Sequence, residues 1–319
     1  MSSTGTSQQP HVPPAGIWAP AITFFDPETD ELDLASQTKY YKYLSHHLTG
    51  LVILGTNAET FLLTRDERAA LLKCARDAVG PDYPLMAGVG GHSTKQVLQY
   101  IDDAHKAGAD YVLVLPCAYF GKATTAKVIQ NFYTDVATES PLPVVVYNFP
   151  GVCNGVDLDS ETITALAKQH SNIVGVKLTC ASVGKITRLC ASLPSNQFAT
   201  FGGQSDFLLG GLSSGSAGCI AAFANIFPKT ISRIYRLFEE GKHAEALELH
   251  QKAALAESLS KSGIANTKYA AAITSAKAAG IEGAEEKLRP RRPYEPVSEE
   301  GKKGIRGLME EMVEIEDSL

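Results

Sequence analysis

The sequence predicts an α/β fold in which eight β/α units close into a (β/α)8 barrel, with additional helices at the C-terminal end. Short apolar segments alternate with helical segments of about 10–15 residues, and this alternation demands a parallel sheet. Eight such units fit into about 220 residues, a length typical of a closed barrel. We therefore expect a tail at residues 1–15, a barrel at residues 16–240 and a helical extension at residues 241–319 that packs on the barrel.

The strand candidates are rich in β-branched residues and end in glycine, proline or polar residues. They lie at residues 16–25, 50–55, 84–90, 111–116, 143–150, 172–179, 197–202 and 218–223. The helices expected after them lie at residues 36–46, 64–79, 93–107, 125–138, 160–168, 183–192, 205–212 and 228–239. Thr64 with Glu67 forms a capping box, and Ser93 is a helix N-cap. Three further amphipathic helices, at residues 244–258, 261–279 and 299–317, exceed what a barrel needs.

The composition favours small molecules as binding partners. The 29 basic and 35 acidic side chains form no long block of one sign, so binding to nucleic acid or to an anionic membrane is not expected. No apolar run approaches the roughly 20 residues of a membrane span. The six cysteines show no C-x-x-C spacing and indicate reduced, intracellular thiols. Residues 1–15 are rich in Ser, Thr, Gln and Pro and contain no Lys or Arg, so they lack the features of a signal peptide and of a mitochondrial transit peptide. We therefore expect them to form a disordered tail of a cytoplasmic protein.

Lys177 stands inside the apolar segment that should form the sixth strand. Burial without a partner lowers the pKa of a lysine, and the resulting neutral amine is a nucleophile for carbonyl carbons. A lone lysine could instead lie at the end of the strand and extend to water. However, Tyr147 occupies the matching position of the preceding strand, and neighbouring strand ends of a parallel barrel face one site. A phenol beside an amine can move protons during imine formation, so the pair favours a Schiff-base lysine.

The turn after the second strand carries polar side chains in the order Gly55-Thr56-Asn57-Ala58-Glu59. Backbone N–H groups in such a turn suit a carboxylate or a phosphate. Helix capping explains Thr56 and Asn57 equally well, and Glu59 could serve only to brace the turn. Glu59 is also the only His, Asp or Glu at the expected strand ends, so a metal site is not predicted there.

Taken together, Gly55–Glu59, Tyr147-Asn-Phe-Pro150 and Gly175-Val-Lys177 resemble the signatures of the dihydrodipicolinate synthase and N-acetylneuraminate lyase superfamily. The resemblance covers nearly the whole chain from Gly16. It implies that Lys177 forms a Schiff base with pyruvate, that Tyr147 relays protons, and that no metal or organic cofactor takes part. The expected catalytic residues are Lys177, Tyr147, Thr56 and Tyr119, and the expected substrate-binding residues are Thr56, Asn57, Thr179, Gly203, Gln204, Ser205 and Ile220.

Some of these roles rest on the resemblance alone. Thr56 and Asn57 match the residues that hold the carboxylate of pyruvate, and Gly203 and Ile220 match positions that line its pocket. Tyr119 matches a tyrosine that is often lent across a tight dimer, although Ala118 replaces one aromatic residue of that motif.

Other positions bear on the substrate. In the synthases, an arginine two residues after the proline of Y-N-x-P binds the carboxylate of aspartate semialdehyde. Val152 occupies this position here and cannot make the charged contact, so aspartate semialdehyde is disfavoured as a substrate. Thr179, Gln204 and Ser205 match positions that contact sugar hydroxyls in neuraminate lyases. The Thr56-Asn57 pair resembles 4-hydroxy-2-oxoglutarate aldolases and 2-keto-3-deoxy sugar-acid aldolases.

The prediction is a class I aldolase that cleaves a 2-keto-3-deoxy sugar acid, such as 2-keto-3-deoxy-L-galactonate (L-threo-3-deoxy-hexulosonate), to pyruvate and an aldehyde in sugar-acid catabolism. A homo-oligomer, a dimer of dimers, is expected. The alternatives are a 4-hydroxy-2-oxoglutarate aldolase, a dihydrodipicolinate synthase, a metal-dependent barrel lyase and a barrel that binds an oxo-acid without turnover. Residues 288–296, rich in Arg and Pro, form either a cationic recognition loop or a solvated connector.

Overall fold

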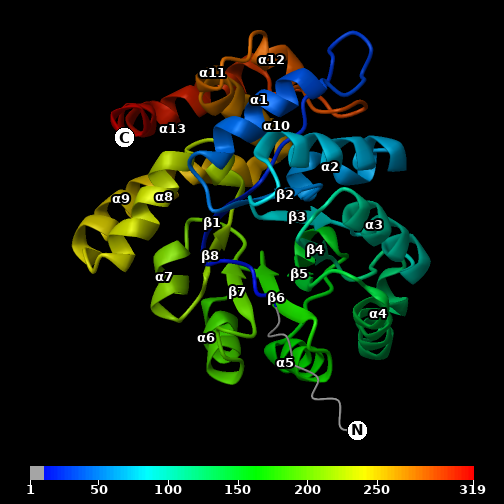
Figure 1. The fold of residues 1–319 in the computed structure, drawn as a ribbon. Helices are drawn as coiled ribbons and strands as arrows, with labels where there is room; N and C mark the ends of the chain where they lie inside the picture. The colour runs from blue at the N-terminus through cyan, green and yellow to red at the C-terminus, as the bar shows by residue number, and fades with distance from the viewer. Residues whose placement is uncertain (1–10) are drawn as a thin grey trace, which may run out of the picture.

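The computed structural model describes residues 11–319, which are built around a closed barrel of eight parallel strands (Figure 1). The strands are hydrogen-bonded in chain order, and β8 pairs with β1 to close the barrel. They are β1 (Gly16–Pro20), β2 (Gly50–Ile53), β3 (Leu85–Gly88), β4 (Tyr111–Val114), β5 (Val144–Asn148), β6 (Ile173–Leu178), β7 (Ala199–Gly202) and β8 (Gly218–Ile220). The predicted barrel is confirmed.

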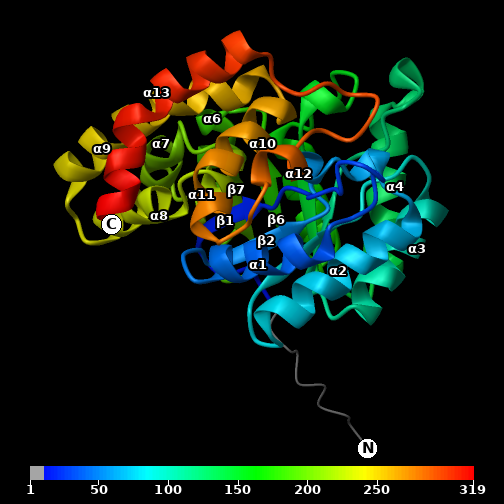
Figure 2. The same cartoon turned by 90° about the horizontal axis from the view of Figure 1, so that it is seen from above.

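Helices surround the strands, as the view from above shows (Figure 2). They are α1 (Leu34–Ser45), α2 (Arg65–Val79), α3 (Thr94–Lys106), α4 (Ala126–Glu139), α5 (Ser160–Gln169), α6 (Val183–Ser192), α7 (Leu208–Ser213) and α8 (Pro228–Glu239). The predicted capping box of Thr64 and Glu67 at α2 and the Ser93 cap at α3 are both confirmed. Helix α7 begins at Leu208 rather than at the predicted residue 205, after Phe207 with non-helical dihedrals (φ −120°, ψ 20°). Among the described residues, no helix is long and apolar enough to cross a membrane.

Two apolar cores result from the alternation of side chains along the strands. One core fills the space between the strands and the helices, and the other fills the interior of the barrel. Trp18 and Phe201 pack edge to face inside the barrel, with ring centres 6.3 Å apart. Gly50 of β2 makes room for Trp18, because a Cβ atom at this position would lie 2.4 Å from the indole ring. The barrel is therefore filled by side chains and is not a pore.

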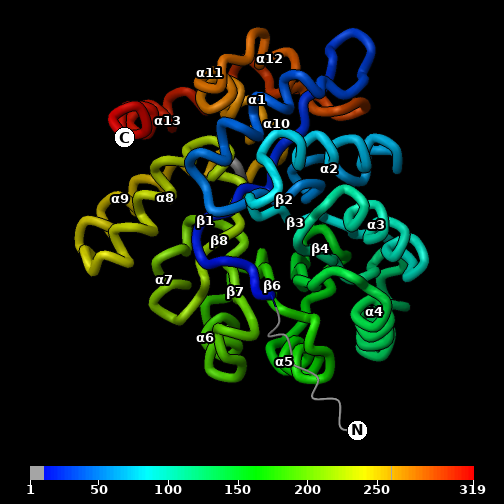
Figure 3. The backbone as a smooth tube through the Cα atoms, in the orientation of Figure 1, coloured from blue at the N-terminus to red at the C-terminus, as the bar shows by residue number. Residues whose placement is uncertain are grey.

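The segment before β1 lies against the barrel (Figure 3). Trp18 Nε1 donates to the carbonyl of Pro14 at 3.1 Å, and the Tyr111 hydroxyl donates to the carbonyl of Val12 at 3.1 Å. His11 stacks on Tyr111 with ring centres 5.1 Å apart. Of the predicted disordered tail, residues 1–10 lie outside the described residues, whereas residues 11–15 contact the barrel because their carbonyls satisfy buried donors.

The extension after α8 consists of helices that pack on the barrel's outer layer. They are α9 (His243–Glu257), α10 (Ile264–Ile273), α11 (Ser275–Ala278), α12 (Ala284–Lys287) and α13 (Glu299–Ser318), with the 3₁₀ turn η6 (Ser258–Ser262) after α9. The prediction of one helix over residues 261–279 is wrong, since the backbone leaves the helical region at Thr274 (φ −121°, ψ −97°) and separates α10 from α11. Figures 1 and 2 show α10, α11 and α12 beside α1, and α13 beside α9.

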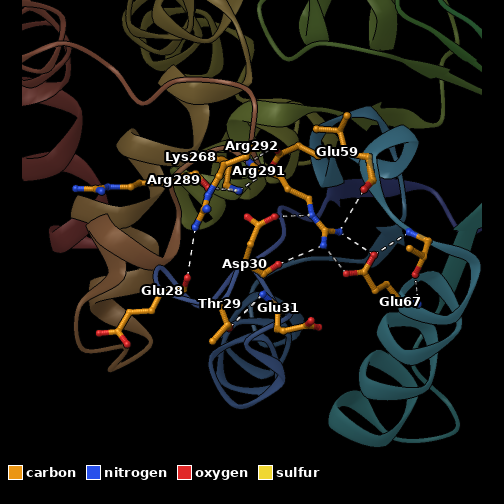
Figure 4. A network of polar contacts seen from close by, with 12 residues as sticks. Glu28, Thr29, Asp30, Glu31, Glu59, Glu67, Lys268, Arg289, Arg291 and Arg292 are labelled. Atoms are coloured by element: carbon orange, nitrogen blue, oxygen red, sulfur yellow. Dashed lines mark hydrogen bonds and ion pairs between the residues drawn. The ribbon is translucent and has the colours of Figure 1, made fainter.

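The Arg/Pro-rich run at residues 288–296 was predicted to be a cationic recognition loop or a solvated connector. At Arg291 it is neither, because this side chain is bound within the fold (Figure 4). The Arg291 guanidinium makes two contacts of 2.7 Å with the Glu67 carboxylate and one of 3.3 Å with Asp30. Its side chain is 14% exposed. The charge of Arg291 is thus used to tie this segment to α2 and to the loop before α1.

Glu316 near the end of α13 caps the N-terminus of α8. Its carboxylate accepts from the backbone N–H of Lys229 at 2.9 Å, and from the N–H and hydroxyl of Thr230 at 2.8 and 2.6 Å. A carboxylate at this place satisfies donors that the helix cannot satisfy and complements the helix dipole. The last helix of the chain is thereby joined to the last helix of the barrel.

Replacing Glu316 by alanine should lower the free energy of unfolding by about 1–2 kcal/mol, the usual value of a lost helix cap. Urea unfolding of the whole protein measures the change. Glu314→Ala, an exposed position on the same helix, is the matched control and should change stability by less than about 0.5 kcal/mol. Equal effects of the two substitutions would contradict the capping role.

Candidate active site

Lys177 and Tyr147 lie side by side at the C-terminal ends of β6 and β5. The two residues are paired in the register of these strands, and both side chains are buried. The Lys177 Nζ lies 4.3 Å from the centre of the Tyr147 ring. The apolar residues that precede each of them form the strands, and this regular structure sets the spacing of the amine and the phenol. The structure thus brings together an amine and a phenol.

Thr56 adds a third group from the turn after β2. The segment Thr56–Ala58 forms the 3₁₀ turn η1, and no side chain caps its N-terminus. The Thr56 Oγ1 instead lies 3.4 Å from the Tyr147 hydroxyl. Helix capping, the alternative explanation of Thr56, does not describe this geometry.

Glu59 follows the same turn and is held by residues of the C-terminal extension (Figure 4). It has a left-handed backbone (φ 58°), and its carboxylate accepts from Lys268 Nζ at 2.5 Å and from the Arg291 backbone N–H at 2.7 Å. The Lys268 side chain is 0% exposed. Burial lowers the pKa of Lys268, whereas the contact with Glu59 opposes that change. Glu59 therefore braces the turn, and its partner Lys268 is a residue that sequence reasoning missed.

A cavity of about 420 Å³ opens at these strand ends. Its lining contains seven of the predicted site residues: Thr56, Asn57, Tyr147, Lys177, Thr179, Gly203 and Gln204. Phe149, Val152 and Ala222 also line it, and the C-terminal extension contributes Glu257, Lys261, Gly263 and Ile264. A second cavity of about 490 Å³, bordered by Phe61 and Tyr294, shares Thr56, Gly263 and Ile264 with the first.

Thr179 and Gly203 lie in contact within this lining. A Cβ atom at position 203 would lie 2.1 Å from Thr179 Oγ1, so glycine is needed for the close approach. Among the described residues, the buried Thr179 hydroxyl has no hydrogen-bond partner. A buried hydroxyl without a protein partner is the kind of group that a ligand satisfies.

Three predicted site residues do not line the cavity. Ile220 is fully buried in the core inside the barrel. The Ser205 hydroxyl donates to the Glu257 carboxylate at 2.6 Å. Tyr119 is 70% exposed, with its ring centre 5.4 Å from that of His92 and 5.3 Å from that of Phe120.

Asn148 of the Y-N-x-P motif secures the loop beside the cavity. Its side chain donates to Asp157 at 2.6 Å and accepts from the Leu158 N–H at 2.9 Å, and its carbonyl accepts from the Thr179 N–H at 2.9 Å. Lys185 Nζ also contacts Asp157, at 2.6 Å. Sequence reasoning assigned Asn148 no role, although an amide in an apolar strand was a visible signal.

Within residues 11–319, no three His, Cys, Asp or Glu side chains gather as metal ligands would.

The sequence matches known proteins along almost its whole length. It shares 70% identity over 311 residues with a Coccidioides immitis protein named "Putative 4-hydroxy-2-oxoglutarate aldolase, mitochondrial", covering 97% of this chain and 99% of the relative. It is 37% identical over 319 residues to an Emericella nidulans protein named "Probable 4-hydroxy-2-oxoglutarate aldolase, mitochondrial" (98% and 99% covered). An Aspergillus niger protein named "L-threo-3-deoxy-hexylosonate aldolase" is 34% identical over 333 residues (95% and 96% covered).

These names contradict the prediction of a cytoplasmic protein. The C. immitis and E. nidulans relatives are both named mitochondrial, which points to a mitochondrial location instead. The prediction rested on the absence of Lys and Arg from residues 1–15, and the composition of so short a segment does not decide protein import.

The fold and the sequence lead to the same family. A solved structure of a dihydrodipicolinate synthase family protein from C. immitis superposes with a TM-score of 0.93 and 66% identity, covering 98% of this chain and 100% of the other. Residues 13–312 match the Dihydrodipicolinate synthetase family. The chain therefore belongs to the dihydrodipicolinate synthetase family, and it is a class I aldolase of that family.

Proposed function

We propose that the enzyme cleaves a 2-keto-3-deoxy sugar acid, such as 2-keto-3-deoxy-L-galactonate, to pyruvate and an aldehyde. The observation that carries the proposal is the chemistry of the cavity wall. Val152 stands at the position where a cationic side chain would be needed to bind a second carboxylate of the substrate. Thr179 and Gln204 present polar groups without charge. Lys261, the lining lysine other than Lys177, is paired with Asp206. Uncharged polar groups suit the hydroxyls of a sugar chain.

Lys177 is the nucleophile of the proposed reaction. Its amine adds to the C2 keto carbon, water leaves, and the resulting iminium accepts the electron pair of the C3–C4 bond as that bond breaks. Tyr147 takes the proton of the C4 hydroxyl, which becomes the carbonyl of the released aldehyde. The pyruvate enamine is then protonated at C3, and water hydrolyses the imine to release pyruvate and restore the amine. Thr56 and Asn57 hold the substrate carboxylate, and Thr56 lies in reach of the Tyr147 hydroxyl.

A second candidate substrate is 4-hydroxy-2-oxoglutarate, because a relative that shares 70% identity is named for it. This substrate carries a second carboxylate at the end that leaves as the aldehyde. Lys261 is the lining cation that could meet that carboxylate, after giving up its contact with Asp206.

We also propose how copies of the chain associate. Phe61, His92, Tyr119 and Phe120 form an aromatic cluster at the surface, in which Phe61 stacks on His92 with ring centres 5.5 Å apart. Exposed aromatic side chains in contact are typical of a protein interface. We infer that this cluster joins two copies in a dimer that lends Tyr119 to the partner site, and that dimers pair into a tetramer.

Tyr147→Phe should lower kcat by about 10²–10⁴-fold, because it removes the proton-transfer hydroxyl and leaves the ring beside Lys177. Steady-state release of pyruvate measures the loss. Tyr235→Phe on the outer helix α8 is the control and should leave kcat unchanged. A Tyr147→Phe enzyme with a near-normal kcat would assign the proton transfer to another group.

A comparison of substrates tests the proposed function. We expect kcat/KM for 2-keto-3-deoxy-L-galactonate to exceed kcat/KM for 4-hydroxy-2-oxoglutarate by at least about tenfold. It should exceed kcat/KM for the condensation of pyruvate with aspartate semialdehyde by the same factor. Tenfold is the lower end of the affinity that one charge-assisted hydrogen bond contributes. Val152→Arg should narrow the difference by supplying the missing cation. If 4-hydroxy-2-oxoglutarate is the better substrate of the unaltered enzyme, the second candidate replaces the first.

A further inference from the structure

Lys268 is a buried lysine that the proposed reaction does not use. It lies on α10 of the C-terminal extension, and its side chain has no exposed surface. Its Nζ also lies 4.7 Å from the centre of the Phe25 ring. Lysine side chains are almost never fully buried unless they are paired, because burial disfavours the charged ammonium group. The place where the partner of Lys268 stands therefore shows what this lysine can do.

Lys268 and its partner Glu59 join three parts of the chain (Figure 4). The Lys268 Nζ donates to one carboxylate oxygen of Glu59 at 2.5 Å and to the carbonyl of Arg289 at 3.0 Å. The other carboxylate oxygen of Glu59 accepts from the Arg291 N–H at 2.7 Å. Helix α10 and the segment after α12 are thereby fixed to the residue that follows η1.

Glu59 is also part of the backbone of the turn that carries Thr56 and Asn57. Its N–H donates to the Thr56 carbonyl at 3.0 Å, and the carbonyl of the preceding Ala58 accepts from the Thr23 hydroxyl at 2.8 Å. The left-handed backbone of Glu59 is uncommon for a residue with a side chain, and such a conformation persists where surrounding contacts hold it. A displacement of the Glu59 side chain would therefore be passed to Thr56.

We propose that Lys268 is a positioning residue, which acts through Glu59 to hold the Thr56-Asn57 pair in the place where it binds the carboxylate of pyruvate and of the substrate. The inference rests on the proposed function, which assigns that carboxylate to Thr56 and Asn57. Both of these residues line the catalytic cavity, whereas Lys268 is not among the described residues that line it. Its effect on the substrate is thus indirect.

The position of the pair predicts which kinetic constant depends on it. Lys177 and Tyr147 lie on β6 and β5, and the hydrogen bonds of the sheet hold them. The turn with Thr56 and Asn57 lies outside the strands and depends on side-chain contacts. Loss of the Lys268 contact should therefore weaken binding of the carboxylate and leave the chemistry of the bound molecule nearly unchanged.

Lys268→Met removes the ammonium group and keeps most of the side-chain length. Borohydride trapping of the pyruvate imine, measured over a range of pyruvate concentrations, separates binding from chemistry. The half-saturating pyruvate concentration should rise about tenfold, whereas the maximal trapping rate should stay within about twofold. The KM for 2-keto-3-deoxy-L-galactonate should rise by a similar factor with little change in kcat. Glu316→Ala, which removes the cap of α8, is the control for destabilisation and should shift neither constant.

The double variant Glu59→Gln/Lys268→Met separates positioning from stability. Lys268→Met alone leaves the buried Glu59 carboxylate without its ammonium partner, whereas the double variant removes both charges. The double variant should therefore unfold at a higher urea concentration than Lys268→Met. Its half-saturating pyruvate concentration should nevertheless stay raised, and by no more than in Lys268→Met, because both variants lose the same contact. If Lys268→Met does not fold, the double variant alone carries the test.

The inference is overturned if the double variant regains normal pyruvate affinity, or if a folded Lys268→Met binds pyruvate normally or loses maximal rate instead. An equal shift in Glu316→Ala, or loss of folding in both Lys268 variants, assigns the pair to stability and also overturns it. An unaltered enzyme that pyruvate and borohydride do not modify overturns the proposed mechanism, and this inference with it. Failure to cleave the sugar acid together with the expected shift in pyruvate trapping overturns the proposed substrate and supports the role of Lys268.

Discussion

The buried ion pair between Lys268 and Glu59 is the contact on which the rest of the site depends. It joins α10 of the extension to the turn that carries Thr56 and Asn57, and both side chains are almost fully buried. Lys268 also donates to the carbonyl of Arg289 at 3.0 Å, and Glu59 accepts from the Arg291 N–H. Removing one partner of such a pair leaves an unpaired buried charge, which costs about 3–5 kcal/mol. The turn and the extension therefore hold each other in place.

This arrangement divides the chemistry of the site between two parts of the chain. The strand ends of the barrel supply Lys177 and Tyr147, which in the proposed mechanism act on the keto group that the candidate substrates share. The extension supplies Glu257, Lys261, Gly263 and Ile264 to the lining of the same cavity. The strands are held by the hydrogen bonds of the sheet, whereas the extension is joined to the barrel by side-chain contacts such as that of Lys268 with Glu59.

The sequence predicted the elements whose pattern is local. The β/α alternation led to the barrel, and Lys177 was noticed because a lysine in an apolar strand is a chemical anomaly. Contacts between distant positions left no such pattern. Glu59 and Lys268 are 209 positions apart, and Ser205 and Glu257 are 52 apart, so only the folded chain brings them together. Ser205 was predicted to bind substrate from the resemblance to neuraminate lyases, whereas in this chain its polar groups are bound by α9, a contact that the sequence does not reveal.

The central claim is that Lys177 forms the covalent intermediate. Borohydride reduction in the presence of pyruvate, followed by peptide mass spectrometry, tests it directly, because reduction converts an imine into a stable secondary amine. The account predicts inactivation and one adduct with the mass of reduced pyruvate on Lys177. Lys261 lines the same cavity and Lys185 is buried nearby in contact with Asp157, so both are internal controls. An adduct on either of these lysines, or full activity after reduction, would contradict the account.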